Sequence, residues 1–196
     1  GKCGLQILRY ANGEDCSPVA KQDYEPPIKS IGHGITTKED LENAAEVWNV
    51  ILSLTQDIGH KLRVYNKDAG GIAIDIRDNQ LEHRQWQCQF PARTHSTSYI
   101  AKAAFDLFAR SYQWSNPIRS VTVRAINLTS QDLPEQMDLF VDRTQIERHD
   151  KLESVVEQLR DRFGKYAVIP AALCSKNSKM PTDREIELKM PTGMVS

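Results

Sequence analysis

The chain has 196 residues, of which 40% are hydrophobic and 26% are charged, a composition typical of a globular domain. No apolar run approaches the roughly 20 residues that cross a bilayer, and no secretory signal opens the chain, so we predict a cytoplasmic protein without a membrane partner. The net charge of −1 excludes an overall basic field, so any surface for nucleic acid must be a local patch.

Charge is unevenly distributed along the chain, and the cysteines and histidines do not form a metal-binding pattern. Residues 28–124 carry 12 Lys and Arg against 10 Asp and Glu, whereas residues 130–163 carry 5 against 9, which makes the second segment a poor candidate for phosphate contact. The four cysteines and five histidines show neither C-x-x-C nor H-E-x-x-H spacing. This predicts free thiols and no metal site.

The N-terminal third is predicted to contain two helices and one strand. Residues 2–11 form a helix that ends at Asn12-Gly13, and residues 14–27 are a polar, proline-bearing linker. A strand over residues 28–35 leads into a long helix, for which Thr36 and Thr37 are candidate N-caps with Glu39 and Asp40 as capping-box partners. The apolar side chains at helical spacing are Leu41, Ala45, Trp48, Leu52, Ile58 and Leu62. Residues 66–71 then form a turn.

Two alternating segments follow and predict a hairpin. Ile72, Ile74 and Ile76 alternate with smaller or polar residues, and residues 78–80 form the turn. In the next strand Trp86, Cys88 and Phe90 alternate with Gln85, Gln87 and Gln89. A second helix is predicted over residues 96–113 and a last strand over residues 118–128.

The order β-α-β-β-α-β predicts an α+β fold, a four-stranded antiparallel sheet with two helices on one face. The opposite face is expected to be open and polar, because one residue in two along each strand points away from the helices. Its expected side chains include Arg77, Gln85, Gln87, Gln89, Thr122 and Arg124, with Asp75 as an acid. Trp48, Trp86 and Phe90 are expected in the core.

The C-terminal part contains a short peptide of special interest. Residues 129–143 are a predicted loop that holds Gln136-Met137-Asp138-Leu139-Phe140, a pattern that resembles peptides docking on a bacterial sliding clamp. An amphipathic helix is predicted over residues 145–163, with Leu152, Val155, Val156, Leu159 and Phe163 as its apolar side. Residues 175–196 are a predicted flexible tail.

Four pieces of the sequence, in order, resemble the Y-family translesion DNA polymerases of the DinB or ImpB/MucB/SamB type. The residues around Tyr10 to Val19 resemble the end of the family's thumb domain, and Lys29 to Gly32 resembles the entry to its little-finger domain. Ile118 to Arg124 is similar to the last little-finger strand. The Gln136 peptide and the end of the following helix resemble the tail of bacterial members.

This resemblance implies a division of the chain and a set of partners. Residues 1–13 would be the end of a thumb, 14–27 a linker, 28–128 a little finger, and 129–174 a clamp-binding motif with a C-terminal helix. The implied partners are duplex template-primer DNA and the sliding clamp. The DNA-binding residues would be Lys29, Ser30, Gly32, His33, Thr36, Arg77, Arg84, Gln85, Gln87, Arg119, Thr122 and Arg124. The clamp-binding residues would be Gln136, Met137, Leu139 and Phe140.

The acidic motifs with which the family's palm domain holds two Mg²⁺ do not occur in this sequence. The resemblance therefore implies the C-terminal part of a polymerase, with no catalytic residue, cofactor or metal site of its own and no polymerase activity alone.

Two other functions fit the same residues. A stand-alone β-α-β-β-α-β module could bind RNA or a small ligand, although the open sheet lacks the exposed aromatics on which RNA bases stack. A clamp-binding adaptor could use the Gln136 peptide alone. Each site also has a simpler explanation, since antiparallel sheets normally have a solvated polar face and Met137, Leu139 and Phe140 could pack inside the domain.

Overall fold

The computed structural model of the chain describes residues 1–19, 21, 24, 26–133, 143–174 and 179. The helices are α1 (Lys2–Ala11), α2 (Ala44–Val64), α3 (Thr97–Ser111) and α4 (Arg143–Phe163), followed by the 3-10 helix η1 (Ala171–Cys174). The strands are β1 (Ser30–Leu41), β2 (Lys67–Asp78), β3 (His83–Thr94) and β4 (Ile118–Ser130). The predicted β-α-β-β-α-β order is confirmed.

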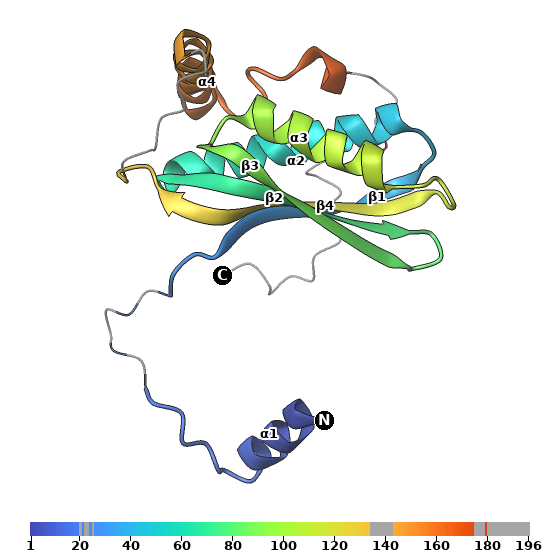
Figure 1. Cartoon of the computed structure of the whole chain (residues 1–196), viewed down its shortest axis with the longest axis vertical. Helices are drawn as coiled ribbons and strands as arrows, with labels where there is room; N and C mark the ends of the chain where they lie inside the picture. The colour runs from blue at the N-terminus through green and yellow to red at the C-terminus, as the bar shows by residue number, and fades with distance from the viewer. Residues whose placement is uncertain (20, 22–23, 25, 134–142, 175–178, 180–196) are drawn as a thin grey trace.

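The four strands form one antiparallel sheet in the order β1-β4-β2-β3. The last strand in sequence therefore lies inside the sheet, between β1 and β2, and β1 and β3 are the two edges. Helices α2 and α3 both cover the same face (Figure 1). The predicted α+β class with both helices on one side is confirmed.

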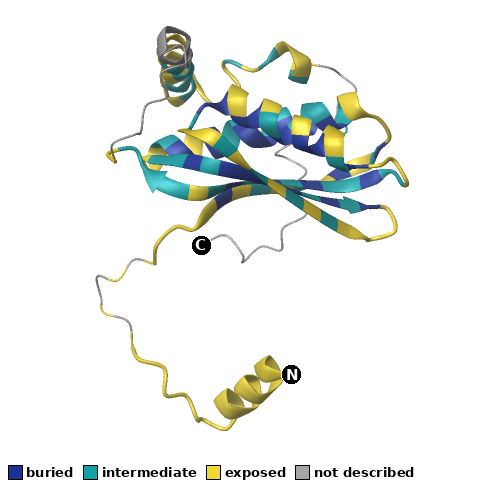
Figure 2. Ribbon diagram, in the orientation of Figure 1, coloured by how far each residue is buried: buried dark blue, intermediate teal, exposed yellow. Residues whose placement is uncertain are grey.

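The core lies between these two helices and the sheet (Figure 2). Ile72, Ile74 and Ile76 of β2 are buried against Ile58 of α2 and Phe108 of α3. Each fully buried side chain of this size contributes about 1.5–3 kcal/mol relative to an exposed one. The alternation read from the sequence of β2 thus selects the face that meets the helices.

The aromatic residues predicted for the core lie on the helix side of the sheet or between helices. Trp86 and Phe90 of β3 meet Tyr112 and Tyr99 edge to face, with ring centroids 6.3 and 5.2 Å apart. Trp48 of α2 meets Phe105 of α3 at 5.2 Å. These contacts confirm the assignment of the three predicted residues to packing.

The predicted helix start at Thr36 and Thr37 is wrong, because β1 continues to Leu41. Thr37 Oγ1 donates to the carbonyl oxygen of Arg119 in β4 (3.1 Å), and Leu41 is fully buried, so tertiary contacts hold these residues in the sheet. The N-cap of α2 is Asn43, whose side chain accepts from the Glu46 N–H (3.0 Å). Glu46 in turn accepts from the Glu42 N–H (2.8 Å).

Two further boundaries differ from the prediction. The turn predicted over residues 66–71 is confined to Asn66, with a φ of 51°, and β2 begins at Lys67. The stripe of α2 that faces the sheet consists of Val47, Ile51, Leu54, Ile58 and Leu62, whereas Ala45 is exposed and Trp48 faces α3. Helical periodicity fits both stripes, and contact with the sheet decides between them.

The ends of the chain add little to this core. Helix α1 buries none of its residues and lies apart from the sheet (Figure 1). Among the described residues, no helix is long and apolar enough to cross a membrane. The Gln136–Phe140 peptide and, except for Lys179, the predicted tail lie outside the described residues.

Candidate nucleic-acid interface

The register of the sheet arranges the residues of its open face in four rows across the strands. Each row takes one residue from β1, β4, β2 and β3, in that order. The rows are Ser30–Ile126–Gly71–Gln89, Gly32–Arg124–Ala73–Gln87, Gly34–Thr122–Asp75–Gln85 and Thr36–Ser120–Arg77–His83. Eight of the predicted DNA-binding residues therefore come together on one surface: Ser30, Gly32, Thr36, Arg77, Gln85, Gln87, Thr122 and Arg124.

Glycines in β1 make room for the side chains of β4. A Cβ placed on Gly32 would lie 2.4 Å from Cγ of Arg124, and one on Gly34 would lie 2.2 Å from Oγ1 of Thr122. Both distances are far shorter than a van der Waals contact. The side chains of Arg124 and Thr122 therefore occupy the space above β1 that side chains at positions 32 and 34 would need. The result is a shallow hollow on this face, bordered by Arg77, Arg124 and the backbone of residues 32–36.

The hollow carries more basic than acidic charge. Arg77 Nη2 donates to Oγ1 of Thr36 (3.2 Å), which holds its guanidinium across the sheet from β2 to β1. Asp75 is the one carboxylate in the four rows, and His83 Nδ1 lies 3.4 Å from its Oδ1. Arginine, glutamine, serine and threonine side chains on such a surface can donate to phosphate oxygens without reading bases.

The structure does not bring all predicted residues to this face. Lys29 is exposed just before β1. Arg84 points to the helix side, where its guanidinium lies 5.9 Å from the ring centroid of Tyr112. Arg119 is engaged at the end of β1, donating to the carbonyl oxygen of Lys38 (3.0 Å) and lying 3.6 Å from Asp40.

His33 also points to the helix side, because it alternates with Gly32 and Gly34 and shares the side of Ile31. Its Nδ1 lies 2.9 Å from Oδ2 of Asp57 in α2, and Lys165 Nζ lies 2.8 Å from the other carboxylate oxygen. Burial would raise the pKa of Asp57, but hydrogen bonds and charge from His33 and Lys165 outweigh it and lower the pKa to about 2. Asp57 of α2 therefore contacts both His33 of β1 and Lys165 of the segment after α4.

Ser120, Gly34 and His83 also belong to the four rows, although they were not among the predicted DNA-binding residues. The period of two contained the signal for them. Ser120 is in phase with Thr122 and Arg124, and Gly34 is in phase with Gly32 and Thr36. The same rule places Arg84 with Trp86 and His33 with Ile31, on the opposite side.

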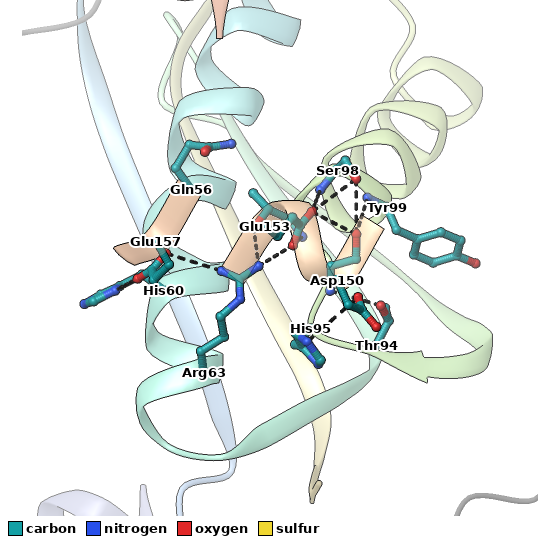
Figure 3. Close-up of polar contacts among 12 residues, drawn as sticks. Gln56, His60, Arg63, Thr94, His95, Ser98, Tyr99, Asp150, Glu153 and Glu157 are labelled. Carbon is teal, nitrogen blue, oxygen red and sulfur yellow. Dashed lines mark hydrogen bonds and ion pairs between the residues drawn. The ribbon is translucent and has the colours of Figure 1, made fainter. Parts of the chain in front are cut away.

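A second polar site joins α4 to the helix layer (Figure 3). Glu153 accepts hydrogen bonds from the main-chain N–H groups of Thr97 (3.0 Å) and Ser98 (3.2 Å), and from the Ser96 hydroxyl (3.0 Å). Arg63 of α2 contacts the same carboxylate. Because the first N–H groups of a helix have no partner within it and carry partial positive charge, Glu153 caps α3 from outside.

Further polar contacts extend this docking along α4. Glu157 pairs with His60 and Arg63, and Arg160 Nη2 donates to the Gln56 side chain (2.9 Å). Of the five residues predicted for the apolar side of this helix, Val156 is half-buried, whereas four are exposed: Leu152, Val155, Leu159 and Phe163. The polar side of α4 turns inward because Arg63 and the N-terminus of α3 offer charge-assisted hydrogen bonds there.

Ligand atoms of His60, Glu157 and Asp161 lie within 4.8 Å of one another, the one such group among the described residues. Arg63 Nη1 lies 3.5 Å from Glu157 Oε2 and supplies a positive charge to the same carboxylate. We therefore assign His60 and Glu157 to the ion-pair network of α4.

Comparison with known proteins places this fold in a family. The sequence pattern described as the impB/mucB/samB family C-terminal domain matches residues 28–139. A protein named DNA polymerase IV from Acetivibrio thermocellus is 38% identical over 168 residues, which cover 86% of this chain and 42% of the relative. A DNA polymerase IV from Alkaliphilus oremlandii is 30% identical over 186 residues, covering 90% and 46%.

The chain thus spans less than half the length of these relatives. A solved structure described as a Y-family DNA polymerase chimera matches 66% of this chain and 36% of its own, with a TM-score of 0.47 and 14% identity. The family pattern covers more than half of the chain and coincides with the sheet and its two helices. The chain therefore belongs to the Y-family DNA polymerases of the impB/mucB/samB type, and residues 28–139 are its C-terminal domain.

Proposed function

We propose that the domain formed by β1 to β4 is the little finger of a translesion DNA polymerase and grips duplex template-primer DNA through its open sheet face. The contacts are to backbone phosphates and are indifferent to sequence, as a polymerase that travels along any template requires. The relatives named DNA polymerase IV support this proposal. The single observation that carries it is the gathering of Arg77, Arg124 and polar side chains on the face that α2 and α3 leave open.

The exposure of the face supports contact with a large ligand. Ser30, Gly32, Thr36, Gln85 and Gln87 are all exposed. The four rows contain no Phe, Tyr or Trp, which argues against an RNA-recognition sheet that stacks bases on aromatic rings.

A second element of the proposal is a tether to a bacterial sliding clamp through Gln136, Met137, Leu139 and Phe140. Two apolar side chains on a short peptide give affinity of about micromolar order. Tethering raises the local concentration of the polymerase at the primer end without new contacts to DNA.

In this proposal, nucleotide transfer is catalysed by parts of the full-length enzyme outside this chain. Those parts include the carboxylates that hold two Mg²⁺. The chain itself contributes grip and position. Its proposed functional sites are therefore binding surfaces.

A salt titration tests the DNA part. Fluorescence anisotropy with duplexes of unrelated sequence should give equal affinities that fall with salt, with a log–log slope of about −2 to −4 for a few phosphate contacts. Equal binding of single-stranded RNA would favour the RNA-binding alternative. Absence of duplex binding at low salt, with clamp binding retained, would favour the adaptor.

A further inference from the structure

Lys179 lies against the outer edge of β1, far from its own position in the sequence. The Lys38 N–H donates to the carbonyl oxygen of Lys179 (2.9 Å), and Lys179 Nζ donates to the carbonyl oxygen of Asp40 (2.8 Å). Because β1 is the first strand in the sheet order, its outer side has no neighbouring strand. One residue thus provides both a strand-like main-chain bond and a side-chain anchor to this edge.

The anchor sits in an acidic corner where β1 meets α2, formed by Glu39, Asp40, Glu42 and Glu46. Lys179 Nζ donates to Oε2 of Glu46 (3.1 Å), and 19% of the Lys179 side chain is exposed. Burial would lower the pKa of Lys179, but the hydrogen bond and charge of Glu46 and the charges of Glu42 and Glu39 outweigh it and raise the pKa. The corner therefore favours a charged ammonium group.

We propose that the outer edge of β1 and this acidic corner form a docking site for a lysine residue, held through its main-chain carbonyl oxygen and its ammonium group, and that the occupant is Lys179 of this same chain. Main-chain pairing with the strand edge supplies affinity, and the ammonium group in the corner supplies register and specificity. Lys179 in this position occupies a hydrogen-bonding site on an edge that would otherwise be available to a strand of another molecule.

The site has two consequences for its neighbours. Asp40 receives Lys179 at its carbonyl oxygen and lies 3.6 Å from Arg119 at its carboxylate, so both cations lie on the same short stretch of β1. Glu46 joins the corner to the N-cap of α2, because its main-chain N–H donates to the side chain of Asn43. Loss of the Lys179 ammonium group would leave the negative charges of these carboxylates with one fewer neighbouring positive charge.

Amide hydrogen exchange in the full chain tests the site directly. Lys179→Met keeps an unbranched side chain and removes the charge, so the Lys38 amide should exchange at least about tenfold faster than in the wild type. Glu46→Gln should give a similar acceleration, and combining the two should add little, because both break the same contact. Lys151→Met, an exposed lysine of α4, is the matched control and should change nothing at Lys38.

The amide of Ile74 in the central strand reports whether the variants remain folded. An unchanged Lys38 exchange rate in Lys179→Met, with Ile74 still protected, would overturn the proposal. Protection that rises with protein concentration, with a doubled mass in light scattering, would mean that a second copy supplies the lysine and would overturn the intramolecular occupant.

Discussion

Gly34 of β1 and Thr122 of β4 are direct partners across the antiparallel pair, and Thr122 occupies the space that a side chain on Gly34 would need. A Cβ on Gly34 would lie 2.2 Å from Oγ1 and 3.0 Å from Cβ of Thr122. The neighbouring partners Gly32 and Arg124 repeat this arrangement. The polar surface of β4 therefore depends on the lack of side chains in β1.

Gly34→Ala is expected to destabilise the domain by about 1–3 kcal/mol, the usual cost of overpacking. Denaturant unfolding measures the change. The double variant Gly34→Ala with Thr122→Gly removes the atoms that collide and should show a favourable coupling of at least about 1 kcal/mol. Strictly additive effects of the two substitutions would contradict the steric explanation.

Loss of charge from the open face and from Lys29, just before β1, should weaken DNA binding uniformly. Arg124→Ala combined with Lys29→Ala is expected to reduce affinity for all duplex sequences alike and to lower the salt slope by about 2, since each cation neutralises about one phosphate. Arg110→Ala removes a charge from α3, on the opposite side of the sheet, and should leave binding unchanged. An equal loss of DNA affinity in the double variant and in Arg110→Ala would argue against DNA binding through the open sheet face.

Removing Glu153 should release α4 from the helix layer. Glu153→Ala leaves the first N–H groups of α3 and the guanidinium of Arg63 without their anion, and a loss of about 1–3 kcal/mol is expected. Faster exchange of the Thr97 and Ser98 amides and faster proteolysis within α4 would report it. Asp161→Asn removes a carboxylate from the same helix outside this cap and should have a smaller effect. Unchanged protection at Thr97 would show that Glu153 is dispensable for docking.

Asp57 should make the fold sensitive to acid. Its pKa is lowered from 3.8 to about 2 in the folded protein, so its stabilising contribution is present above pH 3.8 and is lost as the pH falls through about 2. The shift corresponds to about 2 kcal/mol. Denaturant unfolding between pH 6 and pH 2 should show this loss in the wild type, and Asp57→Asn should remove the corresponding part of the pH dependence. An identical pH profile in the variant would contradict the role of the His33–Asp57–Lys165 contact.

The proposed clamp tether predicts that replacing both Leu139 and Phe140 with alanine abolishes binding to a bacterial sliding clamp and leaves the unfolding transition unchanged. The two apolar side chains supply the buried area of such a peptide. Leu133→Ala, an exposed leucine that precedes the peptide, is the control. Surface plasmon resonance on immobilised clamp measures the affinity. Unfolding of the double variant would instead mean that these residues pack within the domain.

Local sequence determined the order and type of the elements in the main domain. The period of two around Ile74 and around Trp86 fixed the hairpin and its buried side, and Ser96, the predicted start of the second helix, is the N-cap of α3. The same period assigns His33 and Arg84 to the helix side, although the family resemblance implied that both bind DNA. These features follow from neighbouring residues along one strand or helix, so no knowledge of distant contacts is needed.

Tertiary structure alone decided which distant segments meet. It extended β1 through Thr37 to Leu41, because the hydroxyl of Thr37 finds a carbonyl oxygen in β4 and Leu41 finds the core. It also placed β4 between β1 and β2, which sets Arg124 over Gly32, and turned the carboxylates of α4 towards Arg63 and the N-terminus of α3. Periodicity describes one element at a time, whereas pairing order, register and docking depend on free energies shared between elements far apart in the sequence.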